Sequence, residues 1–187
     1  MTGFRAFLGK ELAEIVRTWR IWVVPGLLLL FAVTSPPIAL ATPVLVASIA
    51  GGQPGVVIQV PEPTALDAFG QFVKNLNQIV VLALIIAGAG SVSSERSAGT
   101  AVLVLTKPLS RAAFVLAKIA SQALLLVAAT AVAALITAAL TALLFDAPPV
   151  LDFARAVAIW LVFAVLLVTV MVLLSVIVPS RGGAAGA

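Results

Sequence analysis

The chain contains four apolar stretches that are each long enough to cross a lipid bilayer, and short polar segments separate them. A membrane-spanning helix needs about 20 consecutive apolar residues. Of the 187 residues, 63% are hydrophobic and only 10% are charged, whereas a soluble domain is about 45–50% apolar and about 25% charged. A water-soluble fold of this length could not bury so much apolar surface. The sequence therefore predicts an all-α polytopic integral membrane protein, with residues 1–187 forming one transmembrane domain.

An amphipathic helix is predicted ahead of the four spans, over residues 4–20. Apolar residues recur there at helical spacing, and the charged residues, including Glu11, are assigned to the opposite face. Such a helix is expected to lie flat in the lipid headgroup layer; a cytosolic helix packed on a partner is the alternative. The spans themselves are predicted at about residues 21–46, 76–92, 111–145 and 156–178.

Proline and capping residues predict where these helices bend, begin and end. Ser35-Pro36-Pro37 should kink or end the first span, because proline lacks the N–H that a helix needs. Thr64 with Asp67 forms a capping-box pattern, so a helix should begin at Ala65. Residues 146–152 are expected to form a turn. The third span exceeds the thickness of the bilayer core, so its first two turns, through Lys118, are expected to project into water.

The basic residues divide unequally between the two sides of the predicted membrane. Cytoplasmic segments of membrane proteins carry an excess of Lys and Arg. If the N-terminus is inside, nine of the 11 basic residues lie inside and two lie outside. Both termini are therefore predicted to be cytoplasmic, and residues 93–110 form a cytosolic loop. The predicted outer residues are Lys74 and Arg155.

Several classes of chemistry are disfavoured by the residue types. The chain has no His and no Cys, which removes imidazole catalysis, thiol nucleophiles and Cys/His zinc sites. No P-loop occurs, and no acidic residue lies deep within a predicted span. The basic residues are too scattered to indicate a nucleic-acid partner. The sequence thus predicts a protein that is not an enzyme, with no catalytic residue, metal site or cofactor of its own.

Polar residues within or beside the spans are candidates for a translocation path. Three threonines share one face of the third span, although threonine hydroxyls in helices bond back to the preceding turn, which favours simple packing. Three amides lie on one face where the second span begins, and a vestibule and a hydrated helix end both fit them. The candidates are Thr130, Thr137, Thr141, Gln71, Asn75 and Gln78.

The predicted cytosolic loop carries the patterns ERSAGT and TKPLSR on either side of a short apolar stretch. Together with the N-terminal Lys10-Glu11-Leu12 helix, these patterns resemble the membrane subunits of type-2 exporter-group ABC transporters, over essentially the whole chain. The resemblance implies the permease subunit of an ABC exporter in a prokaryotic plasma membrane. It also implies that the loop couples the permease to a cytosolic ATPase. The coupling residues would be Glu95, Arg96, Gly99, Thr100, Leu103, Pro108, Ser110 and Arg111.

The same resemblance implies the partners of the chain. Two separately encoded ATPase subunits would bind ATP and magnesium, and permeases would pair as a homodimer or pseudo-dimer. Permeases of this group usually have six spans, so we expect about two further spans after Ala187 in the natural gene. The alternative is a membrane anchor or assembly subunit that recruits a cytosolic partner and transports nothing. Drugs, lipids, peptides and ions all remain compatible as substrates.

Overall fold

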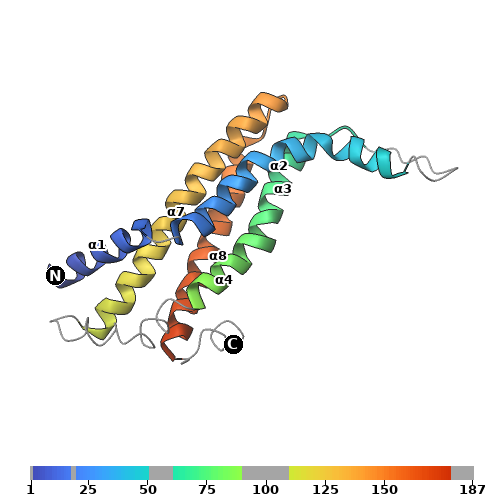
Figure 1. The fold of residues 1–187 in the computed structure, drawn as a ribbon. Coiled ribbons are helices and arrows are strands. Elements are labelled where there is room, and N and C mark those ends of the chain that lie inside the picture. The colour runs from blue at the N-terminus through green and yellow to red at the C-terminus, as the bar shows by residue number, and fades with distance from the viewer. Residues whose placement is uncertain (1, 18–19, 51–60, 90–109, 178–187) are drawn as a thin grey trace.

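The computed structural model describes residues 2–17, 20–50, 61–89 and 110–177. The described parts are helical, with short connections and no strand among them (Figure 1). The helices in chain order are α1 (Thr2–Arg17), α2 (Arg20–Ala50), α3 (Ala65–Asn75), the π-helix η1 (Leu76–Val80), α4 (Val81–Ala89), α7 (Arg111–Leu144) and α8 (Val150–Ile177).

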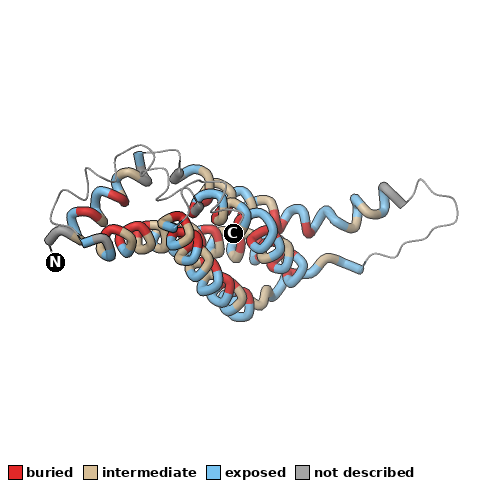
Figure 2. The backbone as a smooth tube through the Cα atoms, turned by 90° about the horizontal axis from the view of Figure 1, so that it is seen from below, coloured by how far each residue is buried: buried red, intermediate tan, exposed pale blue. Residues whose placement is uncertain are grey.

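Four of the helical segments are long and apolar enough to cross a membrane. They cover Trp22–Ser48, Ala65–Gly88, Ala112–Leu144 and Val150–Ile177. Figure 2 shows that buried residues gather where the helices face one another, while the outward faces are exposed. A bundle of apolar helices with exposed apolar faces is what a lipid environment favours. The prediction of an all-α membrane protein with four spans is confirmed.

Helix α2 continues through all four of its prolines, Pro25, Pro36, Pro37 and Pro43. Figure 1 shows that it bends and that its C-terminal part extends away from the bundle. Each proline leaves a carbonyl of the preceding turn without its helical donor, which accounts for the bend. The predicted kink is confirmed, whereas the alternative that the helix ends at Ser35-Pro36-Pro37 is wrong.

The second span begins earlier than residue 76. Its helix starts at Ala65, as the capping pattern predicts: Asp67 Oδ2 accepts hydrogen bonds from the Thr64 N–H at 2.8 Å and from the Thr64 hydroxyl at 2.7 Å. From Ala65 the chain runs through α3, η1 and α4 as one rod. Phe72 in α3 is fully buried. Helix α3 therefore packs in the bundle as part of the second span.

The third and fourth spans form a helical hairpin. Helix α7 begins where predicted, because the Ser110 side chain accepts a hydrogen bond from the Ala113 N–H at 3.1 Å. Helix α8 begins at Val150, so the predicted turn over residues 146–152 is too long. The Pro149 carbonyl already accepts from the Phe153 N–H at 3.1 Å, and Asp152 pairs with Arg155 at 2.9 Å.

Aromatic and small residues set the packing between these rods. At the end of the bundle near the hairpin turn, the Phe69 and Phe153 rings stack with centroids 4.1 Å apart. At the other end α4 and α8 approach closely, since a Cβ added at Gly88 would lie 2.7 Å from the Cβ of Met171. The absence of a side chain at Gly88, near the end of α4, therefore allows the close helix approach that is typical of membrane packing.

Candidate functional site

The predicted coupling loop joins α7 at a well-defined helix start. Ser110 is the N-cap of α7 and Arg111 is its first residue. The serine hydroxyl satisfies one of the backbone N–H groups that every helix leaves without a partner at its beginning. The loop thus ends on a long, regular helix. The other predicted coupling residues lie outside the described residues: Glu95, Arg96, Gly99, Thr100, Leu103 and Pro108.

A buried ion pair connects α1 to α7 close to that helix start. Lys118 Nζ lies 3.0 Å from Glu11 Oε2, and the exposed fractions of the two side chains are 2% and 7%. Two predictions are therefore wrong: Lys118 does not project into water, and Glu11 does not lie on a solvated face of the N-terminal helix. The physical reason is that α1 packs across the first turns of α7 and covers both side chains.

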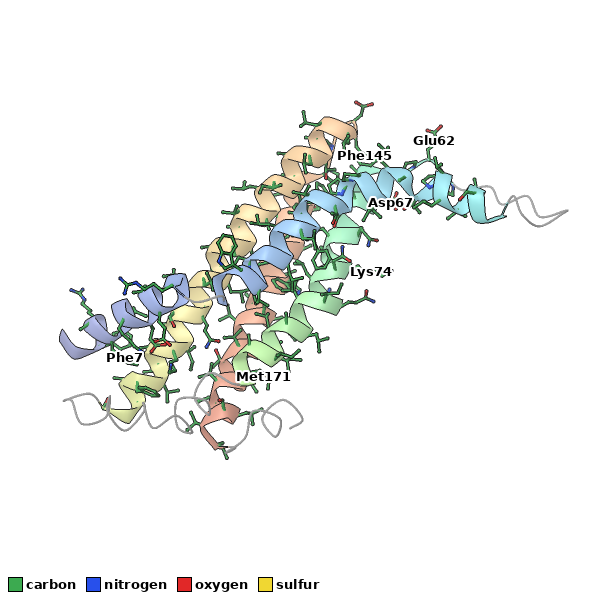
Figure 3. The ribbon with its side chains drawn as sticks, in the orientation of Figure 1. Phe7, Glu62, Asp67, Lys74, Phe145 and Met171 are labelled. Atoms are coloured by element: carbon green, nitrogen blue, oxygen red, sulfur yellow. The ribbon has the colours of Figure 1, made fainter. Side chains whose placement is uncertain are left out.

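Aromatic rings line this junction between α1 and α7. The ring centroids of Phe7 and Phe114 are 5.2 Å apart, and Figure 3 shows Phe7 between α1 and the beginning of α7. Lys118 Nζ lies 5.3 Å from the centroid of the Phe114 ring, a cation–π arrangement. The Lys118 ammonium is therefore held by a carboxylate and a ring face together, which offsets part of the cost of burying it.

Lys10 extends the charged network to the surface of α1. It contacts Glu11 at 3.2 Å and also pairs with Glu14, one turn further on. Burial lowers the pKa of Lys10, but the hydrogen bond to Glu14 and the nearby Glu11 carboxylate outweigh burial and raise it above the ordinary 10.5. A raised lysine pKa adds stability that is lost only as pH rises through the folded value, so the contribution of Lys10 is fully present at neutral pH.

A second polar cluster joins α2 to α3, within the two helical segments that form the first and second spans. The buried Asn75 side chain donates a hydrogen bond to the Ser35 hydroxyl at 3.2 Å. Asn75 also accepts from Gln71, at 3.5 Å. The structure therefore brings Gln71 and Asn75 together against the residue that precedes Pro36 and Pro37. Buried polar groups in a membrane protein need such partners, because lipid offers none.

Gln78 is separated from this cluster. It is exposed, whereas Asn75 is buried. Residues 76–80 form a π-helix, in which each hydrogen bond closes over one more residue than in an α-helix. The wider turn rotates Gln78 away from the direction that α-helical spacing gives it. Only Gln71 and Asn75 among the three amides thus share an environment.

The three threonines of α7 are all buried, with no exposed surface. The hydroxyl of Thr137 donates to the Ala133 carbonyl at 2.9 Å, and that of Thr141 donates to the Thr137 carbonyl at 2.8 Å. The hydroxyls of these two threonines thus have hydrogen-bond acceptors within α7 itself, as is typical of threonines that serve helix packing. Thr130 differs, since its hydroxyl finds no hydrogen-bond partner in the described part of the chain.

The sequence contained a signal for the buried ion pair that pattern reading passed over. Glu11 lies four residues after Phe7 and four before Ile15, which places it within the apolar stripe of α1. Lys118 lies four residues after Phe114 in a predominantly apolar helix. A charge of each sign on a helix face that must be buried indicates a pair. Ser35 has a similar signal, a hydroxyl within an apolar span, directly before two prolines.

The described residues include no group of three or more Asp, Glu, His or Cys side chains that could hold a metal ion.

Comparison with known proteins gives one result. The model of a family described as "ABC-2 family transporter protein" matches residues 5–187. No curated protein matches the chain, and no solved structure does.

Proposed function

The chain belongs to the ABC-2 family of transporter proteins, and from that membership we propose that it is the permease subunit of an ABC exporter in a prokaryotic plasma membrane. The observation that carries the proposal is the family match over residues 5–187, on a chain with four helices fit to span a membrane. Permeases of this family are not themselves catalytic. ATP hydrolysis therefore belongs to a separate cytosolic ATPase subunit.

The orientation follows from charge. With nine of 11 basic residues on the side of α1, the positive-inside rule places α1, the beginning of α7 and the end of α8 at the cytosolic side. Figure 1 supports this grouping, since α1 and these helix ends lie toward the same end of the bundle. The ATPase would bind there, on the loop of residues 93–110, through Glu95, Gly99 and the residues around them.

The translocation path would form between paired permeases, as a homodimer or pseudo-dimer. The cluster of Gln71, Asn75 and Ser35 supports a path beside α2 and α3, because it puts hydrogen-bonding groups at membrane depth. The bend in α2 and the π-helix η1 adjoin this cluster. Irregular helix turns of this kind are frequent at functional sites. Gln78 and Thr130 are further candidate contacts to the transported molecule.

Reconstitution with the ATPase encoded beside this gene tests the proposal. The complex in phosphatidylethanolamine–phosphatidylglycerol vesicles should hydrolyse ATP faster than the ATPase alone, and vanadate should abolish the increase. Inside-out vesicles should also accumulate, with ATP, at least one probe from a set comprising a cationic dye, a labelled phospholipid and a labelled peptide. A complex that forms but shows neither effect would identify the chain as a non-transporting anchor.

The loop itself is tested by substitution. Gly99→Val and Glu95→Ala should leave membrane insertion and complex formation intact while removing the increase in ATP hydrolysis, because a conformational change passes only through contacts that differ between states. Gly9→Ala on α1, where an added Cβ meets nothing within 4 Å, is the matched control and should behave as wild type. Normal stimulation in both loop variants would reduce the loop to a connector.

A further inference from the structure

The ion pair between Glu11 and Lys118 links residues that are 107 positions apart in the chain. It also links helices that are not neighbours in sequence. Helix α1 packs mainly against α7, and much less against α2, the helix that follows it. The pair, the Phe7–Phe114 contact and the Lys118–Phe114 contact all lie in this one junction. Helix α1 therefore packs mainly on the third span, α7, and less on the first span, α2.

A buried ion pair is a weak source of stability but a strong source of specificity for its geometry. Removing both charges from water is costly, and their mutual attraction only balances that cost. Removing one partner is different, because it leaves the other charge buried and uncompensated. Two apolar helix faces could slide or rotate on each other at little cost, whereas Glu11 and Lys118 meet only in one register.

The register matters because of what lies next to Lys118. Lys118 is seven residues after Arg111, the first residue of α7, so it lies about 10 Å along the helix at about 1.5 Å per residue. Ser110 caps this same helix start, and the predicted coupling loop ends there. Whatever displaces the end of the loop displaces Lys118, and through the ion pair it displaces α1.

We propose that Glu11 and Lys118 are positioning residues: their buried ion pair locks α1 to the first turns of α7, so that the two helices move as one body with the end of the coupling loop. The inference rests on the proposed function, since it assigns the pair to the transmission of ATPase movement into the membrane. Lys10 and Glu14, which are 47% and 39% exposed at their side chains, are surface charges on the same helix and have no such role.

The first test of this lock, by which we mean the fixed position of α1 on α7 set by the Glu11–Lys118 pair, needs no transport measurement. Because the chain has no Cys, Phe7→Cys with Phe114→Cys gives a defined pair for a short bifunctional thiol reagent. In this background, Glu11→Gln should lower the cross-linking rate at least about tenfold, because the buried Lys118 ammonium loses the carboxylate that holds it against α1. Glu14→Gln, the same substitution one turn away, should leave the rate within about twofold. Equal rates in all three proteins would overturn the lock.

The second measurement asks whether the lock serves coupling. In the permease–ATPase complex, with Phe7 and Phe114 intact, Glu11→Gln should lose most of the stimulation of ATP hydrolysis, and the charge-reversed Glu11→Lys/Lys118→Glu protein should recover it. In the two-cysteine background, the cross-linker should restore stimulation to Glu11→Gln. A slower cross-linking rate with undiminished stimulation would show that the pair is structural only, and would overturn the positioning role.

The outcomes separate this inference from the proposed function. If the wild-type complex shows no stimulation, the proposed function fails, while the cross-linking rates still report on the lock. If Glu11→Gln does not accumulate in the membrane, the charge-reversed protein provides the comparison. It should accumulate and cross-link faster than Lys118→Glu alone. Failure of the second charge to rescue the first would overturn the lock.

Discussion

At the scale of single residues, Gly88 marks a close approach of α4 to α8. A side chain there would meet Met171, whose position on α8 Figure 3 labels, with a Cβ–Cβ distance of 2.7 Å. Both atoms belong to rigid parts of packed helices, so neither can move without shifting a backbone. Hydrogen at this position is what allows α4 and α8 to lie together.

Gly88→Ala should therefore destabilise the protein, by about 1–3 kcal/mol for an overpacked contact. The measurement is the midpoint of thermal unfolding in detergent, followed by size-exclusion chromatography. Gly70→Ala is the control, since an added Cβ there meets nothing within 4 Å and alanine favours a helix; its midpoint should be equal or higher. Equal midpoints for Gly88→Ala and wild type would mean that the two helices are not packed as described.

The Ser35–Asn75 hydrogen bond has a measurable strength. Ser35→Ala, Asn75→Leu and the double variant form a thermodynamic cycle, and we expect a coupling free energy of about 0.5–1.5 kcal/mol, the range for polar contacts between membrane helices. Denaturation in mixed micelles gives the four free energies of unfolding, those of the wild type and of the three variants. Thr42→Ala serves as control, because its hydroxyl donates only to its own helix, at Ile38, and it should show no coupling with Asn75→Leu.

Single-residue roles were predictable where the partner lies nearby in sequence. Ser110 and the Thr64–Asp67 pair act on backbone groups three residues away, so their capping roles follow from local pattern. Glu11 and Lys118 depend on a partner 107 residues distant. An amphipathic pattern assigns charged residues to the solvated face, whereas the packing of α1 on α7 covers the Glu11 carboxylate.

At the scale of the helical elements, the rod of α3, η1 and α4 carries the least regular geometry. A π-turn holds one residue more than an α-turn, and residues 76–80 form such a turn between two α-helices. No local residue pattern in LNQIV marks this geometry. The prediction from sequence therefore gave the correct helix start at Ala65 and an incorrect common face for the side chains beyond Asn75.

Deletion of Asn77 tests the π-turn. Removing the extra residue should convert the rod into a continuous α-helix and leave Leu84 and Gly88 facing their partners, so the protein should still accumulate in a folded form. Deletion of Leu166, which is exposed on the regular helix α8, should rotate all later residues by about 100° and abolish folding. Monodisperse elution in detergent reports on both. Loss of folded protein in the Asn77 deletion as well would contradict the π-turn.

Helix boundaries were predictable to differing degrees for physical reasons. The turn was predicted over residues 146–152, which include Pro148 and Pro149, yet proline is tolerated just before and within the first turn of a helix, where no N–H is needed. Helix α8 thus begins at Val150. In α2 the prolines bend the helix without ending it, and at the fully buried Pro36 neighbouring helices supply packing that holds the bent segment.

At the scale of the whole molecule, the proposed orientation places α1 and the α7–α8 turn on opposite sides of the membrane. Gly9→Cys and Asp146→Cys, both at exposed positions, report on these two sides. In intact cells a membrane-impermeant maleimide should label Asp146→Cys and should leave Gly9→Cys unlabelled until the membrane is permeabilised. The unmodified chain, which has no Cys, gives the background. The reverse pattern would invert the topology.

The junction between α1 and α7 also imposes an order on biosynthesis. Lys118 is synthesised 107 residues after Glu11, which at roughly 5–20 residues per second takes roughly 5–20 s. Throughout that interval Glu11 has no ammonium from α7 to meet, and its carboxylate must remain in contact with water. Helix α1 leaves the ribosome before its partner α7, and therefore reaches its final position only after α7 has been made. Helix α1 is thus a charged helix without its packing partner until α7 covers the Glu11 side chain.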